Sequence, residues 1–232
     1  MRAADHPEEA RRLEVLRLYR VLDTAAEQMF DELTELAAGI CETPISVLSL
    51  VDEHRQWFKS RVGLQAAETL REAAFCAHAI LQTEVFTVHD ATQDPRFADN
   101  PLVVGDPKIR FYAGMPLVVQ EGLPLGTLCV IDRQPRRLSA EQERALQRLG
   151  RVATALLEMR KRAAELKDLE AILPMCSGCR RVREDDGSWH ALEAYVLRHE
   201  PVTHGICPPC MKRLYPEQYA KLLSRGDIDA AE

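Results

Sequence analysis

The sequence has no hydrophobic stretch long enough to cross a membrane. Its longest apolar runs, such as ISVLSLV from Ile45, fall far short of the ~20 residues that a spanning helix needs. Its first residues, MRAADHPEEARR, contain no apolar segment of the kind that a secretory signal carries. We therefore expect a cytoplasmic protein without a membrane partner.

An excess of positive charge is missing as well. The chain has 30 Lys and Arg against 36 Asp and Glu, which gives a net charge of −6. Proteins that bind nucleic acids usually carry a basic surface, so the overall charge gives that function no support. The sequence also lacks internal repeats and low-complexity tracts, which favours ordinary globular domains over a solenoid or a disordered chain.

The chain does contain alternating helical and extended patterns. Residues 7–21 and the stretch that ends at Cys41 have the apolar spacing of amphipathic helices, and TAAE at Thr24–Glu27 matches a capping box. Pairs of extended patterns predict two hairpins, 44–52 with 56–63 and 109–119 with 125–132. Antiparallel hairpins covered by helices predict an α+β fold.

Several phrases within residues 8–157 resemble GAF domains, the small-molecule sensor fold that is related to PAS domains. They are RLYRVLDT, VDEHRQWFKSRVGL, FCAHAIL, DATQDPRFADNPLV, IRFYAGMPL and LGTLCVID. They resemble the GAF domains found in front of bacterial histidine kinases and cyclic-di-GMP enzymes. The resemblance implies an antiparallel sheet flanked by helices. Because no kinase glycine box, G-G-D-E-F cyclase motif or phosphodiesterase motif is present, we expect a sensor that is not itself an enzyme.

The resemblance also implies a ligand pocket between the sheet and its covering helices and loop. The candidate ligand-binding residues are Trp57, Phe75, His78, Arg110, Phe111 and Tyr112. The alternative is that the aromatic ones belong to the core. Cys76 and His78 do not form a catalytic pair, because residues two apart on a helix do not face each other. No nucleophile–resolver cysteine pair is evident in this half of the chain, so a thiol-redox or methionine-sulfoxide reductase enzyme is a weaker alternative.

A cluster of four cysteines lies near the C-terminus, in the pattern C-x2-C-x27-C-x2-C. Two such knuckles can converge on one tetrahedral zinc ion, and clustered cysteines in a reducing compartment are usually ligands or catalysts rather than disulfides. The predicted ligands of one structural Zn²⁺ per chain are Cys176, Cys179, Cys207 and Cys210. The alternative is a redox dithiol at CPPC, which lacks the βαβ surroundings typical of such sites. Residues 173–217 also resemble a zinc-ribbon-like tail of bacterial signalling proteins.

A long helix over residues 139–172 is predicted to connect the two modules, and SAEQ from Ser139 matches a capping box at its start. Its apolar residues recur in alternating steps of four and three, the spacing of a coiled-coil seam. The positions are Ala145, Leu149, Val152, Leu156, Met159, Ala163 and Leu166. We therefore expect a parallel homodimer, with packing of this helix against its own domain as the alternative.

These elements together predict a signal-transduction sensor. A small molecule would bind the GAF-like domain, the dimeric helix would relay the change, and the zinc module would contact a partner protein. The alternative from another class is a zinc-ribbon regulator that binds nucleic acid. Residues 176–225 hold eight Lys and Arg against six Asp and Glu, so a phosphate-binding surface is weakly supported.

Overall fold

The computed structural model describes residues 3–170, 174–176, 178–184, 187–199 and 208–225. The chain divides into two compact units, Met1–Asp168 and Leu169–Glu232. Within the described residues, no helix combines the length and the apolar character that a membrane span requires.

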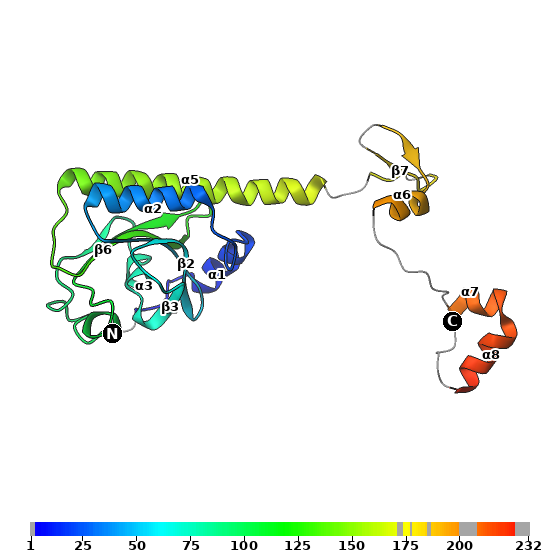
Figure 1. Ribbon diagram of the computed structural model, residues 1–232, viewed down its shortest axis with the longest axis horizontal. Coiled ribbons are helices and arrows are strands. Elements are labelled where there is room, and N and C mark those ends of the chain that lie inside the picture. Colours follow the sequence, from blue (N-terminus) through cyan, green and yellow to red (C-terminus); the bar gives the residue numbers. More distant parts are fainter. Residues whose placement is uncertain (1–2, 171–173, 177, 185–186, 200–207, 226–232) are drawn as a thin grey trace. The chain divides into compact units, whose positions relative to one another are not determined.

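The first unit is built on a six-stranded antiparallel sheet with the spatial order β3-β2-β1-β6-β5-β4 (Figure 1). The strands are β1 (Ile45–Val51), β2 (Arg55–Val62), β3 (Glu68–Leu70), β4 (Phe86–Val88), β5 (Phe111–Val118) and β6 (Pro124–Asp132). The central strands β1 and β6 are buried along their whole length. Both faces of the sheet are therefore covered, and the edge strands β3 and β4 are short, which limits pairing with other chains.

Helices of this unit lie on both sides of the sheet. They are α1 (Glu9–Leu18), α2 (Gln28–Cys41), the 3-10 turn η1 (Arg71–Ala73), α3 (Phe75–Ala79), α4 (Pro101–Val104) and α5 (Ala140–Glu170). Apolar residues of α1, α2 and α5 form one core with side chains such as Leu48 and Leu50 of β1. Val47 and Val51 of β1 join a second core with α3 and the segments around α4. The α+β fold with helices flanking an antiparallel sheet is thus confirmed.

The start of α5 follows the sequence prediction. The Ser139 backbone N–H donates to Gln142 Oε1 at 3.0 Å, and the Gln142 N–H donates to Ser139 Oγ at 3.2 Å. This reciprocal pair is a capping box, which satisfies two amide groups that the helix itself leaves unbonded. The long helix predicted from this point is confirmed up to Glu170, and residues 171–172 lie outside the described part of the chain.

The second predicted capping box is wrong. Helix α2 begins at Gln28, and its start has no side-chain cap. The Thr24 hydroxyl instead donates to the Val21 carbonyl oxygen at 2.7 Å. The Glu27 carboxylate pairs with Lys59 at 2.6 Å and with Arg160 at 2.7 Å. The Glu27 carboxylate therefore bonds to two cationic side chains from distant parts of the chain instead of to a backbone N–H at the helix start. Hydrogen bonds between charged groups are stronger than neutral ones, so these pairs prevail over the local cap.

Helices α2 and α5 lie side by side and run antiparallel (Figure 1). At one end Gln142 Nε2 donates to the Ile40 carbonyl oxygen at 3.1 Å, and at the other end Arg160 pairs with Glu27. The predicted seam of α5 is divided between two environments. Leu149 and Leu156 pack on the core of the sheet, whereas Val152, Met159 and Leu166 are exposed, Met159 to 65%. The coiled coil stays a prediction. It would have to form through the exposed apolar row of Val152, Met159 and Leu166.

In its described residues, the second unit contains a small hairpin and three helices. They are β7 (Val182–Arg183), β8 (Trp189–His190), α6 (Leu192–His199), α7 (Pro208–Leu214) and α8 (Pro216–Arg225). The hairpin and α6 occupy the cysteine spacer, where the sequence predicts a turn and a helix. A zinc-ribbon module stays a prediction for this unit.

Candidate ligand cavity

A cavity of about 250 Å³ opens on the face of the sheet that carries α3, opposite the face covered by α2 and α5. Strands β1 and β2 supply Val47 and Phe58, and α3 supplies Phe75 and Cys76. The cavity lies where short helices and loops, rather than a long helix, cover the sheet. A site of this kind, mostly apolar with a few polar groups, is typical of small-molecule binding.

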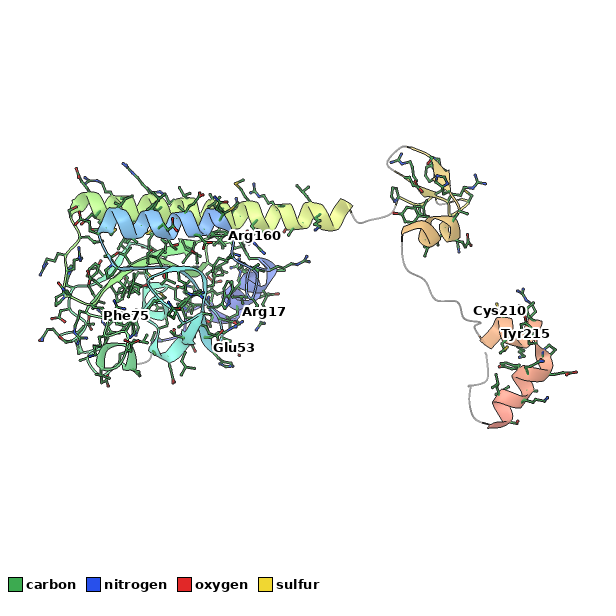
Figure 2. The ribbon with its side chains drawn as sticks, in the orientation of Figure 1. Arg17, Glu53, Phe75, Arg160, Cys210 and Tyr215 are labelled. Carbon is green, nitrogen blue, oxygen red and sulfur yellow. The ribbon has the colours of Figure 1, made fainter. Side chains whose placement is uncertain are left out.

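Two of the six sequence-predicted residues line this cavity, Phe75 and Tyr112. Phe75 extends from the start of α3 (Figure 2), and its ring stacks on Phe97 at 4.0 Å and on Tyr112 at 5.3 Å between ring centroids. Ring stacking of this kind contributes beyond the burial of area alone. Phe75 and Tyr112 therefore form a rigid aromatic side of the cavity, which the stacked ring of Phe97 supports.

The other four predicted residues are placed elsewhere. Trp57 and Phe111 belong to the core on the opposite face of the sheet. His78 lies edge-on to Phe97, with ring centroids 4.8 Å apart. The Arg110 guanidinium donates to the carbonyl oxygens of Val103 and Ile109, at 2.9 and 3.0 Å. Arg110 thus stabilises the loop that borders the cavity through hydrogen bonds to its backbone. Arg110 itself does not line the cavity.

The thiol of Cys76 lies within a cluster of hydroxyl groups. Its sulfur accepts hydrogen bonds from Thr127 at 2.9 Å, Ser49 at 3.1 Å and Tyr112 at 3.2 Å. Burial raises the pKa of this thiol, but hydrogen bonds from Cys129 and the three hydroxyls outweigh it and lower the pKa to about 7. The hydrogen bond that Cys129 makes to Cys76, then burial and the nearby Cys76 charge, hold the pKa of the Cys129 thiol well above its usual value. The fold therefore brings two cysteines together that the sequence left unrelated.

Two further polar groups line the cavity and were not predicted from the sequence. Gln56 of β2 and Thr69 of β3 are directly opposed across the two strands. Gln56 Oε1 and Thr69 Oγ1 are both buried, and neither has a hydrogen-bond partner in the structure. The alternation of side chains along β2 and β3 predicts only that one face of the sheet is buried. It does not predict the cavity, because loops that are distant in the sequence help to form it.

A second polar cluster joins α1, the β5–β6 turn and α5. The Tyr19 hydroxyl lies 2.7 Å from Glu158 Oε1, which also accepts the Gln120 backbone N–H at 2.8 Å. Lys161 pairs with Glu121 at 2.6 Å. Burial, and then the neighbouring Glu158 carboxylate, hold the pKa of Tyr19 well above its usual range. The middle of α5 is therefore bonded directly to the end of the hairpin that carries Tyr112.

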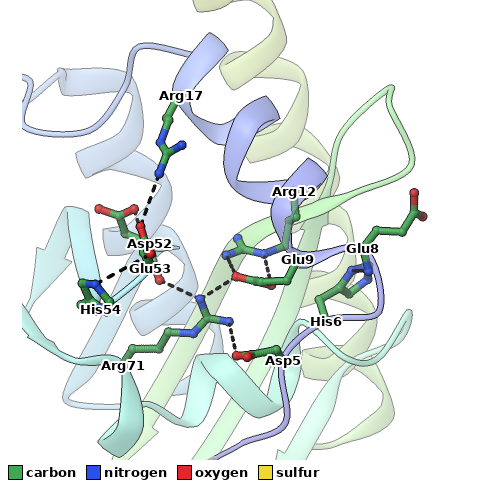
Figure 3. Close-up of polar contacts among 10 residues, drawn as sticks. All are labelled: Asp5, His6, Glu8, Glu9, Arg12, Arg17, Asp52, Glu53, His54 and Arg71. Atoms are coloured by element: carbon green, nitrogen blue, oxygen red, sulfur yellow. Dashed lines mark hydrogen bonds and ion pairs between the residues drawn. The ribbon is translucent and has the colours of Figure 1, made fainter.

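A third cluster anchors α1 to η1 and to the turn after β1 (Figure 3). The Glu9 carboxylate accepts hydrogen bonds from Arg12 of the same helix and from Arg71 of η1, all between 2.6 and 2.8 Å. Arg71 also donates to the Asp52 carbonyl oxygen at 3.0 Å. Burial raises the pKa of Glu9, but the two arginines outweigh it and lower the pKa to about 2. Since η1 directly follows β3, this cluster holds the strand that carries Thr69.

Three of the four predicted metal ligands fall within described segments, and Cys207 lies outside them. Cys176 N–H donates to the Arg181 carbonyl oxygen at 2.8 Å, and the Arg180 N–H donates back to Cys176 at 2.9 Å. This tight turn directs the backbone N–H groups of Cys179 and Gly178 at the Cys176 sulfur, which lowers the pKa of that thiol. Among the residues that the structure describes, no group of three or more His, Cys, Asp or Glu side chains could hold a metal ion.

The family model described as "GAF domain" matches residues 25–157. A protein of Pseudomonas aeruginosa named cyclic di-GMP phosphodiesterase PA2567 is 51% identical over 126 residues. That match covers 54% of this chain and 22% of the relative, so the chain spans about a fifth of the relative's length.

Among solved structures, the GAF domain of an Acinetobacter phosphoenolpyruvate-protein phosphotransferase is 17% identical with a TM-score of 0.49. The match covers 67% of this chain and 98% of that one. The blue-light-absorbing form of the PixJ GAF domain from Thermosynechococcus elongatus is 16% identical, also with a TM-score of 0.49, and the match covers 68% and 93% of the two chains.

One expectation from the sequence is overturned by these comparisons. The lack of familiar kinase, cyclase and phosphodiesterase motifs led us to expect that the chain is not an enzyme. That expectation is wrong, because a relative that shares half of its residues over 126 positions is named as a phosphodiesterase. The similarity covers 54% of this chain and does not depend on any of those motifs.

Proposed function

Because the chain belongs to the GAF domain family, we propose that it senses a small molecule in this domain and thereby controls the hydrolysis of cyclic di-GMP. The observation that carries the proposal is the 51% identity over 126 residues with a named cyclic di-GMP phosphodiesterase. The chain is a GAF-domain signalling protein. The finer assignment to cyclic di-GMP follows from that relative.

The cavity beside α3 is the proposed sensing site. It combines a volume of about 250 Å³, a rigid aromatic side and a few polar lining residues such as Gln56 and Thr69. A ligand changes a protein's state only by binding one arrangement better than another. A ligand that fills the cavity would hold Phe75 and Tyr112 in one arrangement and so supply such a difference.

The route from this site to the rest of the chain is proposed to run through α5. Strand β5 carries Tyr112 at the cavity, and the turn after it bonds to Glu158 and Lys161 of α5. The exposed apolar row at Val152, Met159 and Leu166 supports the parallel homodimer. A change in the hairpin would then alter the pairing of two helices.

The C-terminal unit is proposed to be the output module that contacts a partner protein. One Zn²⁺ would be held by Cys176, Cys179, Cys207 and Cys210. The turn at Cys176, with N–H groups directed at its sulfur, fits a thiolate ligand, and structural zinc would stabilise a segment too small to hold a core of its own. Nucleic acid is not the proposed target, since the charge of this segment is nearly balanced.

The test measures cyclic di-GMP in cells that express the full chain. We expect its level to fall, and the Glu158→Gln variant to weaken the effect, because the amide replaces a charged acceptor of the Tyr19 and Gln120 hydrogen bonds. Glu165→Gln is the matched control, since Glu165 is exposed on the same helix. An unchanged cyclic di-GMP level in cells and no hydrolysis by the purified chain would reject the proposal.

A further inference from the structure

Cys76 places a nucleophilic side chain in the wall of the cavity. It belongs to the first turn of α3, and its sulfur accepts hydrogen bonds from the hydroxyl groups of Ser49, Thr127 and Tyr112 at 2.9–3.2 Å. Burial raises the pKa of this thiol, but hydrogen bonds from Cys129 and the hydroxyls bring it down to about 7. A large fraction of the chains therefore carries a thiolate at neutral pH, and the thiolate is the reactive form of cysteine.

A second cysteine lies next to this sulfur. Cys129 is on β6, two residues after Thr127, so both side chains leave the same face of the sheet. The Cys129 thiol hydrogen-bonds to Cys76 and also donates to the Val47 carbonyl oxygen at 3.5 Å. Cysteines that respond to oxidants combine a low pKa with a neighbouring thiol that can react with the oxidised sulfur. The pair of Cys76 and Cys129 has both properties.

The surroundings of the pair limit what can reach it. Cys76 is 1% exposed and Cys129 is fully buried, so a reagent has to enter through the cavity. A cavity of about 150 Å³ can hold benzene, and this one has about 250 Å³. Its lining is largely apolar beside Phe75, and its charged members Asp106 and Arg133 are exposed at the surface. Because burying an unpaired charge is costly, the reagent should be small and uncharged.

The second thiol selects the kind of reaction. An alkylating reagent would use Cys76 alone, whereas an oxidant that forms a sulfenic acid on Cys76 also gives Cys129 a reaction, because a thiol condenses with a sulfenic acid to a disulfide. Exchange with a peptide disulfide such as glutathione disulfide would need a larger and more open site, since that reagent is charged and bulky. A small hydroperoxide is uncharged, oxidising and fits the available volume.

We propose, resting on the sensing function above, that this cavity admits small uncharged hydroperoxides, which oxidise Cys76 to a sulfenic acid that Cys129 then converts to a disulfide. The Cys76 sulfur attacks the terminal oxygen of R–O–O–H, so that an S–O bond forms and the O–O bond breaks. The alkoxide leaves with the electron pair and takes the proton of the Cys129 thiol, which gives the alcohol.

The second step closes the disulfide. The Cys129 thiolate attacks the Cys76 sulfur, the S–S bond forms, and the S–O bond breaks to release hydroxide. The two sulfurs lose two electrons in total, and the hydroperoxide gains them as it becomes an alcohol and hydroxide. This oxidation removes the thiolate that accepts the Tyr112 hydroxyl at 3.2 Å, and it links α3 to β6. Redox changes of this kind act as switches by altering local charge and packing.

Peptide mass spectrometry of the purified full chain at pH 7 tests the chemistry, with tert-butyl hydroperoxide as the probe. Cys76 and Cys129 fall in different tryptic peptides, so a disulfide joins the two. Cys41 is the internal reference, because it is fully buried in the opposite core and burial raises its pKa to about 11. We expect the disulfide to form at least about tenfold faster than Cys41 is oxidised, and glutathione disulfide to leave the pair reduced.

Variants then assign the two steps. Cys129→Ala should stop the reaction after the first step, so the Cys76 peptide should gain one or two oxygen atoms as a sulfenic or sulfinic acid. Cys76→Ala should leave Cys129 reduced. Cys41→Ala is the matched control, and in it the pair should be oxidised as in the wild type. The wild-type measurement stands even if a variant fails to fold.

The outcomes separate this inference from the broader function. Oxidation of Cys76 no faster than that of Cys41, an equal reaction with glutathione disulfide, or an oxidised Cys76 beside a reduced Cys129 in the wild type would overturn the inference. In cells, a pulse of tert-butyl hydroperoxide should change the cyclic di-GMP level with the wild type but not with Cys76→Ala. Lowered cyclic di-GMP in cells together with an unreactive Cys76 would keep the proposed function and reject the hydroperoxide as its signal.

Discussion

The Glu9 cluster permits a quantitative prediction about stability. The Glu9 carboxylate is 16% exposed and lies between Arg12, which is fully buried, and Arg71 (Figure 3). Arg12 Nη1 already lacks a partner. In Glu9→Gln the two guanidinium groups keep their positive charges and lose the negative charge between them. Removing one member of a buried ion pair leaves an uncompensated charge, which is strongly destabilising.

The size of the effect follows from the pKa of Glu9. The carboxyl group has a pKa of about 2 in the folded protein against an ordinary value of 4.5. Each unit of difference corresponds to roughly 1.4 kcal/mol, so the charged form contributes about 3 kcal/mol to the free energy of unfolding at neutral pH. Because the folded pKa is lowered, this contribution is complete above about pH 4.5 and is lost as the pH falls towards 2.

Urea unfolding of the full chain at a series of pH values measures this contribution. We expect Glu9→Gln to lose about 3 kcal/mol at pH 7 and the gap to the wild type to close as the pH falls below about 4. Glu8→Gln is the matched control on the adjacent residue, because Glu8 and its partner Arg11 are both more than half exposed. Exposed pairs contribute about 0–1 kcal/mol. Equal losses in the two variants, or a gap that does not depend on pH, would refute the reasoning.

Three further measurements test other parts of the structure. Elemental analysis should find one zinc per chain, and Cys179→Ser should reduce that zinc content. The thermal unfolding of the first unit should not change in this variant, because the two units are separately compact. An intact C-terminal unit without metal would contradict this prediction. Met159→Asp should weaken a dimer detected by light scattering, since an unpaired charge in an apolar seam is costly, and a monomeric wild type would rule out the coil. Thr127→Val removes a hydroxyl donor from the Cys76 sulfur, so the thiolate absorbance should titrate at a pH above about 7; an unshifted midpoint would show that this bond does not stabilise the thiolate.

Features encoded over short stretches of sequence were predicted well. The two hairpins and the helix that starts at Ser139 depend on alternation, turns and a capping box, all of which involve neighbours in the chain. The predicted cap at Thr24 had the same local pattern and was wrong, because Lys59 and Arg160 reach Glu27 from elsewhere in the fold. Local patterns are therefore reliable only where no distant charge competes for the same side chain.

The candidate site was predictable only in part, because its polar groups meet through the tertiary fold. Phe75 and Tyr112 were found through family resemblance, whereas Trp57 and Phe111 pack on the opposite face of the sheet. Arg110 is an attractive anion ligand in sequence, but its guanidinium is bonded to backbone carbonyl groups. A bulge at Lys59 of β2, opposite Leu48 and Ser49 of β1, illustrates the difficulty, since a shift of one residue changes which side chains face the cavity.

The hairpin of β5 and β6 connects the cavity to the long helix through direct bonds. One end of β5 carries Tyr112, whose hydroxyl donates to Cys76 at the cavity wall. Beyond the other end, the Gln120 N–H donates to Glu158 of α5, which Tyr19 also contacts. Strands in the middle of a buried sheet resist bending but can tilt as units, because packed cores favour discrete arrangements over continuous deformation. A ligand that moves Tyr112 should therefore shift α5 at Glu158. The next residue is the exposed Met159, where a second helix of a dimer would pack, so the shift would alter the contact between the two helices.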